Sequence, residues 1–225
     1  MMMLASVAGL TQAARPLATD DAGTMEKEKS ETEWSFDYCQ YRPNGTCHSP
    51  GLAIKHGLTE RLDLGLGFTH STDKDSEGNT VGWGMSPLDI GFKMALLKER
   101  QMLPDISVST GFESGSADYS INLILSRTIK DISFHYNLGY NSSGEAMVNG
   151  SLPTSLAAEW QFLDKYRLCG ELCSEISDDR SAVIQNSGLV GGSADLGFAV
   201  WDLGLRIFDR RGPQSSVTTG FTLVF

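Results

Sequence analysis

The stretch Val217-Thr218-Thr219-Gly220-Phe221-Thr222-Leu223-Val224-Phe225 reads as a single β-strand that ends on an aromatic residue. Successive side chains of a strand point to opposite faces, so the odd-numbered residues from Val217 to Phe225 share one, largely apolar, face. The last residues of a soluble protein are usually polar and poorly ordered. An apolar strand face that continues to a terminal Phe is therefore unusual for a soluble protein.

The same alternation recurs along most of the chain. Residues 88–96 alternate large apolar side chains with small or charged ones such as Lys93. Residues 31–41 place three aromatic side chains on one face and Glu33 and Asp37 on the other. An alternation of this length with the charges on one side does not fit a helix. It is typical of a barrel wall that has lipid outside and water inside.

The alternating runs and the turn-rich segments between them predict twelve strands. Their approximate ranges are 31–41, 50–58, 62–68, 88–96, 105–112, 119–127, 132–140, 155–162, 166–176, 189–199, 203–208 and 215–225. Residues 70–84 and 177–186 read as long polar loops. Val200-Trp201-Asp202 reads as the turn between the tenth and eleventh strands, where the phase of the alternation slips.

Turn lengths alternate between short and long, as they do in transmembrane barrels with short periplasmic turns and longer outer loops. We therefore predict an all-β fold in which residues 31–225 form a single transmembrane, antiparallel up-and-down β-barrel of about 12 strands. An even number of strands places both ends of the barrel on the periplasmic side. The alternative is a soluble β-sandwich or lectin-like domain. Such a domain does not explain the terminal Phe225 or the Trp and Tyr residues near strand ends.

Bulk composition excludes several other classes. The chain has 225 residues, 40% of them hydrophobic, and a mean hydropathy of −0.17. A barrel wall averages apolar and polar faces, so this value is compatible with a membrane protein. No apolar run in the sequence approaches the ~20 residues that a spanning helix needs. The net charge of −10 argues against binding to nucleic acid, which requires a basic surface.

Residues 14–24, Ala-Arg-Pro-Leu-Ala-Thr-Asp-Asp-Ala-Gly-Thr, resemble the motif Arg-Pro-Leu-x-Thr-Asp-Asp-x-Gly-Thr. This motif marks small bacterial outer-membrane proteins of the meta-pathway phenol-degradation, or small-molecule transporter, family. Residues 57–65 resemble the strand–turn–strand piece of the same family. The resemblance implies an outer-membrane barrel, and it implies a role in the passage of aromatic or other small compounds.

Gly220, Leu223 and Phe225 resemble the C-terminal signal that the barrel-insertion machinery reads. The expected partners are therefore this machinery, the lipid and lipopolysaccharide of the outer membrane, and a small-molecule solute. The acidic loop around residues 73–77 and the Asp178-Asp179 pair could share divalent cations with lipopolysaccharide, or could simply be solvated.

Residues 1–13 resemble a truncated or atypical signal peptide, short and apolar, with small residues before the cleavage position. Residues 14–30 then form a periplasmic N-terminal segment. We hypothesise that this segment plugs the lumen, with Arg15, Asp20 and Asp21 pairing with wall charges such as Arg167 or Lys93, because buried charges require partners. The alternative is an ordered lead-in that only caps the first strand.

The alternation also predicts which side chains face the lumen. The candidates for lining and selectivity are Glu33, Asp37, Asp63, Asp89, Lys93, His135, Glu159, Arg167, Glu171 and Glu175, with Arg206 as a further cation. Because acidic side chains predominate, we expect a weak preference for cations or the passage of neutral solutes. The alternative is an internal salt-bridge network that fills a narrow barrel.

Cys39 ends the first predicted strand and Cys47 lies in the following loop, so a disulfide across this loop is geometrically allowed in an oxidising compartment. Cys169 and Cys173 lie on one strand, on the order of 13 Å apart, which is too far for a bond between them. Neither the cysteines nor the histidines show metal-ligand spacing, and no cofactor is predicted.

An enzymatic function is disfavoured. Ser133 and His135 share a strand face, but two positions along a strand separate them by about 6.8 Å, beyond the reach of a nucleophile and its base. The sequence contains no Gly-x-Ser-x-Gly motif. We predict a channel for the passive passage of small solutes. A structural or adhesion barrel with a filled lumen is the second candidate, and an outer-membrane lipid hydrolase is the third.

Overall fold

The computed structural model describes residues 15–41, 43–98, 103–142, 144, 150–177, 185–209 and 213–225. Strands account for most of these residues. They are β1 (Ser30–Gln40), β2 (Thr46–Thr59), β3 (Leu62–Lys74), β4 (Thr80–Met85), β5 (Asp89–Leu97), β6 (Asp105–Glu113), β7 (Tyr119–Ile129), β8 (Ile132–Ser142), β9 (Ser151–Leu163), β10 (Tyr166–Ser177), β11 (Gln185–Asp195), β12 (Val200–Phe208) and β13 (Ser215–Val224).

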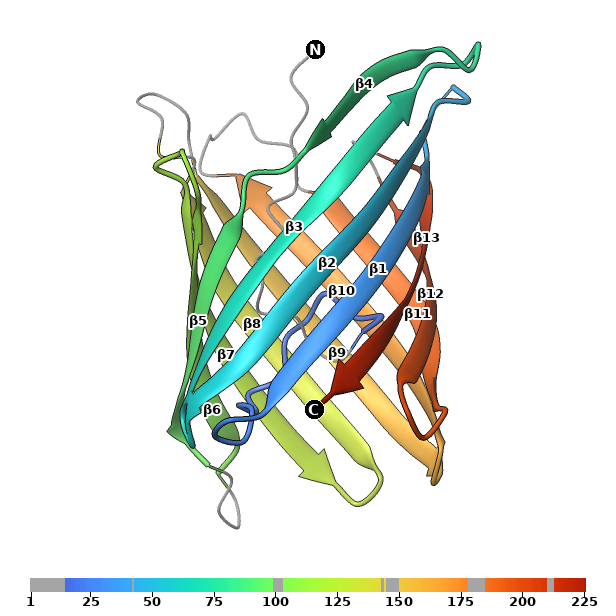
Figure 1. Ribbon diagram of the computed structural model, residues 1–225. Coiled ribbons are helices and arrows are strands. Elements are labelled where there is room, and N and C mark those ends of the chain that lie inside the picture. The colour runs from blue at the N-terminus through green and yellow to red at the C-terminus, as the bar shows by residue number, and fades with distance from the viewer. Residues whose placement is uncertain are drawn as a thin grey trace.

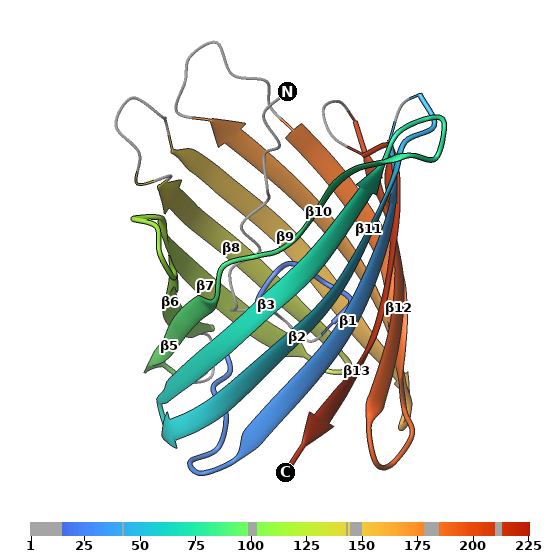
Figure 2. The same ribbon diagram turned by 45° about the horizontal axis from the view of Figure 1, so that its top comes forward.

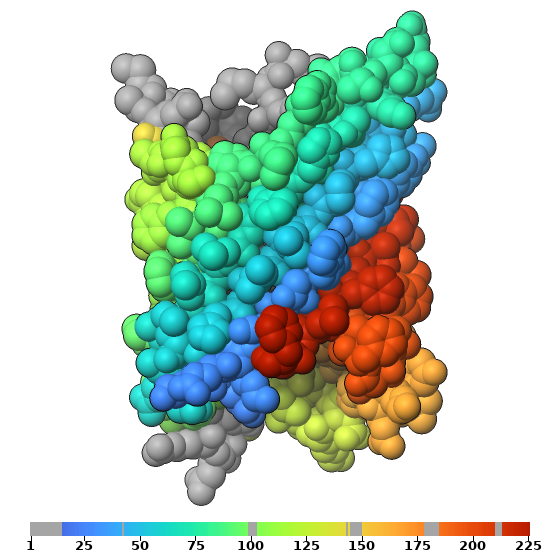
Figure 3. All heavy atoms as spheres, viewed as in Figure 1, coloured from blue at the N-terminus to red at the C-terminus, as the bar shows by residue number. Residues whose placement is uncertain are grey.

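The strands form one antiparallel sheet that closes on itself. Each strand pairs with its sequence neighbour, with one exception: β5 pairs with β3, beside β4. The ring closes between the first strand and the last, where Trp34 lies opposite Phe221. Figures 1 and 2 show the resulting tilted barrel, and Figure 3 shows β1 and β13 side by side on its outer wall. The prediction of a single up-and-down barrel of about 12 strands is confirmed, because β4 and β5 follow each other along β3 and occupy one position in the ring.

The prediction of a polar loop over 70–84 is wrong. The strand β3 continues to Lys74, and β4 returns along it, so that His70 lies opposite Met85 and Thr72 opposite Trp83. This hairpin extends past the end of β5, as Figure 1 shows. The polar and glycine-rich sequence is misleading because the inner face of the extension carries Gly82 and Gly84 rather than large side chains.

The predicted turn at Val200-Trp201-Asp202 is also wrong. The chain turns earlier, between β11 and β12, where the Leu196 N–H donates to the Ala199 carbonyl at 2.9 Å. Gly197 has a φ of 87°, a conformation that glycine adopts without steric cost. All three residues of the predicted turn therefore belong to β12.

The two faces of the wall differ as the alternation predicts. Large apolar side chains point outward and remain exposed, among them Trp34 (56%), Leu172 (67%) and Val190 (74%). Small and polar side chains point inward, and many of these are buried. Within the described residues, no helix is long and apolar enough to span a membrane.

We assign the end of the barrel with the two-residue turns 60–61, 130–131 and 164–165 to the periplasmic side, because short turns lie there in transmembrane barrels. The residues before β1 pass from this end into the barrel interior, as the blue segment in Figures 1 and 2 shows.

Candidate functional site

The candidate site is the barrel lumen together with residues 15–25, which we call the luminal segment. This segment has little regular structure, and its side chains and backbone bond to inner-face residues of many strands. The contacts reach from β3 and β5 on one side of the barrel to β10 and β12 on the other.

Arg15 is buried at one end of the luminal segment. Its Nε lies 3.3 Å from the Asp202 carboxylate, and its Nη2 donates to the Thr218 hydroxyl at 2.6 Å and to the Thr219 carbonyl at 3.0 Å. The Asp202 side chain is 1% exposed. Because a buried guanidinium is costly without a counter-charge, this carboxylate is what makes the burial of Arg15 tolerable.

Glycines on three adjacent strands make room for the first two residues of the segment. A Cβ at Gly204 would lie 2.9 Å from Pro16 Cβ, and a Cβ at Gly191 would lie 2.7 Å from Pro16 Cγ. A Cβ at Gly220 would lie 2.8 Å from the Arg15 Nε. These positions require glycine because the luminal segment approaches the wall backbone closely.

Leu17 is the apolar anchor of the segment. It is 2% exposed and forms one cluster with three inward-facing wall residues, Ala157, Cys169 and Leu189. An apolar patch inside a polar lumen is stable only while something apolar covers it, and here Leu17 does so.

Glu171 receives the next part of the segment. Its Oε1 accepts a hydrogen bond from the Ala18 N–H at 2.8 Å, and it also accepts from the Thr19 N–H and, at 2.5 Å, from the Thr19 hydroxyl. Its Oε2 forms an ion pair with Arg206, which also donates to the Ser187 hydroxyl at 3.0 Å. Both carboxylate oxygens are therefore bonded and the side chain is fixed.

Asp20 is fully buried inside the barrel. Its Oδ1 pairs with Lys93 Nζ at 3.2 Å, and the same ammonium donates to the Asp21 carbonyl at 3.1 Å. With its amide oriented to satisfy both groups, Asn137 accepts from the Asp20 N–H at 2.6 Å and donates to the Asp20 carbonyl at 2.9 Å. The Asp21 Oδ1 accepts from the Gly23 N–H at 2.6 Å, so this side chain shapes the local turn.

Two wall hydroxyls bracket Ala22. The Ser126 Oγ accepts from the Ala22 N–H at 2.7 Å, and the Ser107 Oγ donates to the Ala22 carbonyl at 2.5 Å. Beyond this point the Met25 N–H donates to both oxygens of Asp63, each at 3.0 Å. The chain then reaches the periplasmic mouth, where the Glu28 N–H donates to the Gly57 carbonyl at 2.8 Å.

These contacts bring several predicted site residues together. Asp20 pairs with Lys93, and the Arg15 carbonyl accepts from Arg167 at 3.4 Å. Glu159 pairs with Arg167 at 2.8 Å. The hypothesised pairing of Arg15 and Asp20 with wall charges thus has specific partners. The Asp21 carboxylate instead accepts a hydrogen bond within its own turn, and only the Asp21 carbonyl bonds the wall.

The predicted lumen residues do not include Asp202 or Lys55, although both form ion pairs inside the barrel. Asp202 was assigned to a turn, yet it alternates with Trp201 and Leu203, and this alternation places it on the inner face. Lys55 bonds Glu31 at 3.1 Å and Glu33 at 3.0 Å across the β1–β2 pair. Its alternation with outward-facing Ile54 was the available signal.

Below the luminal segment lies a cavity of about 620 Å³ that reaches the periplasmic mouth. Its lining combines acidic residues, such as Glu33 and Asp63, with basic residues, such as Lys55 and Arg167. The segment itself contributes Arg15 and Asp21 to the lining, along with residues 23–25. Charges of both signs therefore line this inner vestibule.

The outer half of the lumen differs from this vestibule in the charge of its lining. Asp37, Asp89 and Glu175 lie on the inner faces of β1, β5 and β10 towards the outer end, and Glu175 accepts from the Ser151 hydroxyl at 2.6 Å. Asp73 and Glu113 join them on neighbouring strands and were not predicted. Within the described residues, basic side chains that face the lumen lie mostly at the level of the luminal segment or below it.

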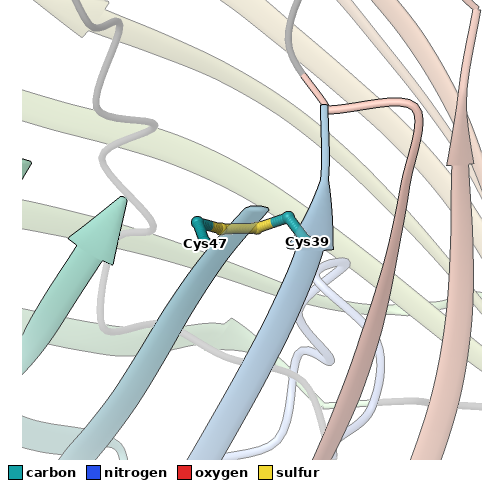
Figure 4. Close-up of a disulfide and its surroundings, with 2 residues drawn as sticks. All are labelled: Cys39 and Cys47. Carbon is teal, nitrogen blue, oxygen red and sulfur yellow. A yellow bond between two sulfur atoms is a disulfide. The ribbon is translucent and has the colours of Figure 1, made fainter. Parts of the chain in front are cut away.

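Cys39 and Cys47 face each other across β1 and β2 and are joined by a disulfide, with a Cα–Cα distance of 4.9 Å (Figure 4). The bond lies at the outer ends of both strands. Cys169 and Cys173 are free, and both face the lumen from β10.

Asp75 stabilises the turn between β3 and β4. Its Oδ1 accepts from the Glu77 and Asn79 N–H groups, both at 2.9 Å, and these bonds hold the pKa of the carboxyl below its ordinary value. Gly78 adopts a φ of 85° in the same turn. The Asp75 carboxylate therefore stabilises the backbone of this turn. The Asp178-Asp179 pair lies outside the described residues.

The inward face of β8 carries His135, but its partner is not Ser133. The His135 Nδ1 lies 2.8 Å from the Ser126 Oγ, and its Nε2 lies 3.9 Å from Glu159. Ser133 instead bonds Thr128 at 2.9 Å. The Ser126 hydroxyl already accepts from Ala22, so it holds the luminal segment rather than facing an open substrate site. Over the described part of the chain, no group of three or more His, Cys, Asp or Glu side chains could hold a metal ion.

Of the predicted insertion signal, Gly220 and Leu223 lie in β13 and Phe225 follows its last residue. Gly220 lies against Arg15 on the inner face, while Phe225 is 69% exposed at the periplasmic end. Leu223 lies opposite Thr32 in β1. Their role as a signal remains a prediction.

Similar folds occur among solved structures of outer-membrane proteins. The NanC porin matches with a TM-score of 0.62 at 10% identity, over 86% of this chain and 98% of that one. The KdgM porin matches with a TM-score of 0.60 at 14% identity, over 87% and 99%. The CymD monoaromatic hydrocarbon channel matches with a TM-score of 0.53 at 8% identity, over 88% of both chains.

No family model matches the chain, and a comparison with curated proteins found no match. At these identities the structural matches establish the fold alone. The closed barrel, its apolar outer face and these neighbours define a porin-like β-barrel of the bacterial outer membrane.

Proposed function

We propose that the protein is an outer-membrane channel for the passive passage of small solutes, and that the luminal segment is a plug that closes it. The observation that carries the proposal is the set of hydrogen bonds and ion pairs from residues 15–25 to strands on opposite sides of a polar lumen. A segment bonded in this way lies across the path of a solute. The porin and channel neighbours support the same class of function.

The solute class follows from the charge of the outer half of the lumen. Asp37, Asp73, Asp89, Glu113 and Glu175 face it from five strands, and acidic linings favour cations. We propose that the channel prefers small cationic or neutral solutes. We include aromatic compounds among the proposed solutes for two reasons. The sequence resembles the meta-pathway phenol-degradation family, and the structurally similar CymD is a monoaromatic hydrocarbon channel.

The test is single-channel recording of the refolded protein in a planar bilayer, with and without residues 15–24. We expect small or rare openings for the intact protein and a larger, steady conductance after the deletion. A salt gradient then gives the selectivity, with a reversal potential on the cation side. Unchanged current after the deletion would reject the plug, and anion preference would reject the proposed selectivity.

The second candidate is a structural or adhesion barrel with a filled lumen. The wall pairs that involve no plug residue, such as Lys55 with Glu33 and Arg167 with Glu159, favour it because they fill the bore with paired charge. A deletion variant that folds but does not conduct would select this candidate.

A further inference from the structure

The contacts of the luminal segment have the character of peptide recognition. The wall bonds the backbone of Ala18, Asp20, Ala22 and Met25, and it reads the side chains of Arg15, Leu17, Thr19 and Asp20. We propose that the inner wall is a peptide-binding site that accepts a free peptide with the sequence of residues 15–25 as well as the tethered segment. This inference rests on the proposed function, because it takes the segment to be a removable plug.

The wall groups that hold the segment are also held by one another. Arg206 is fixed by Ser187 and orients Glu171. Ser193 and Glu159 fix Arg167, at 3.1 and 2.8 Å. His135 fixes the Ser126 hydroxyl at 2.8 Å. A site whose donors and acceptors keep their positions without the ligand loses less entropy on binding. The covalent link between the segment and β1 is therefore not what forms the site.

The site also contains both kinds of recognition that make binding selective. Arg15 and Asp20 each need a particular buried counter-charge, Asp202 and Lys93 respectively. Pro16 needs the bare backbone at Gly191 and Gly204. A peptide with the same composition in another order would leave buried charges unpaired, which is strongly unfavourable.

In the intact protein a free peptide competes with a tethered one. Only residues 26–29 separate the luminal segment from β1, and a short tether gives an effective concentration of about millimolar. Binding in trans is therefore measurable only after the tethered copy is removed or displaced.

The experiment uses the protein without residues 15–24, in a planar bilayer, with a synthetic peptide of residues 15–25 added at the periplasmic side. We expect a reversible, concentration-dependent block. A scrambled peptide should not block, and an Arg15→Ala peptide should require at least a roughly tenfold higher concentration. Equal block by the scrambled peptide, or no block of a conducting channel, would overturn the inference.

Two carboxylates on the same strand provide a matched pair of wall variants. Glu171→Gln should raise the half-blocking concentration by at least about tenfold, because Glu171 accepts three bonds from the segment. Glu175→Gln should leave it unchanged, because Glu175 bonds Ser151 instead. Equal effects of the two variants would indicate general electrostatics and overturn the inference.

A second readout does not depend on conduction. Cys169 lies under Leu17, so bound peptide should protect its thiol from a maleimide in a Cys173→Ser background. If the deletion variant is silent but the thiol is protected, the channel proposal fails and the peptide site stands. If the deletion variant does not fold, the full-length Arg15→Ala variant takes its place in this assay, because it weakens the tethered segment and leaves the wall intact. An unprotected thiol in this variant, with the peptide of residues 15–25 present, overturns the inference.

Discussion

Arg15 and Asp202 are 187 positions apart in the chain, and their side chains meet inside the barrel at 3.3 Å, with exposed fractions of only 6% and 1%. The pair joins the luminal segment to β12, the last strand but one. Neither partner has another described counter-charge at salt-bridge distance, so each depends on the other.

Asp202→Asn and Arg15→Ala should each displace the luminal segment. Breaking a buried ion pair by removing one partner costs about 3–5 kcal/mol, because the other charge is left uncompensated. We expect increased single-channel open probability for both variants. The double variant should resemble the single ones, because the two residues act as a pair. Additive effects would show that they act independently.

Gly204→Ala should displace the segment without changing any charge. The new methyl group would lie 2.9 Å from Pro16 and 3.1 Å from the Thr218 side chain, so the segment must move away. Open probability should increase. The control is Gly84→Ala on β4, where nothing lies within 4 Å of the added Cβ and the current should be unaffected. Equal currents for both variants would contradict the close approach of Pro16.

Leu17→Ala should expose the free thiol of Cys169. The substitution removes most of the apolar cover of a cluster that is otherwise buried, and such truncations typically cost about 2–5 kcal/mol. In a Cys173→Ser background, the rate of Cys169 labelling by a maleimide should increase several-fold over that of the intact segment. An unchanged rate would mean that Leu17 does not control access to this thiol.

The turn at Asp75 should loosen in acid. The hydrogen bonds from Glu77 and Asn79 hold the pKa of Asp75 below its ordinary value of 3.8, so the folded turn favours the ionised carboxylate. Its contribution to stability is present above the ordinary pKa and is lost as the pH falls through the lowered one. Proteolysis of the β3–β4 turn should therefore be faster near pH 2 than at pH 6. Asp75→Asn should remove this pH dependence, with Glu60→Gln in the turn between β2 and β3 as a control.

The alternation of apolar and polar side chains was sufficient to predict the barrel. A wall between lipid and water requires this period of two, and it is visible within short stretches of sequence. The alternation failed around 70–84, because β4 is short and its alternation of Val81, Trp83 and Met85 with glycines follows a run of polar residues that reads as a loop. It also failed at Asp202, where the glycine-rich residues before Val200 obscured the phase.

The partners of the luminal segment were harder to predict. Lys93 was recognised as a lumen cation, but which strands face each other across the bore depends on the tilt and stagger of the closed sheet. These are properties of the whole ring. The sequence near Arg15 therefore contains no information about Thr218 or Asp202, even though it shows that a buried Arg would need such a partner.

The luminal segment touches strands from both ends of the chain, and this fixes the order of events in assembly. Asp63 belongs to the third strand, whereas Asp202 and Thr218 arrive with the last two. The complete set of contacts exists only once the first and last strands are joined. A docked segment therefore indicates that the first and last strands have paired. A barrel whose ring is incomplete cannot be plugged by its own N-terminal residues.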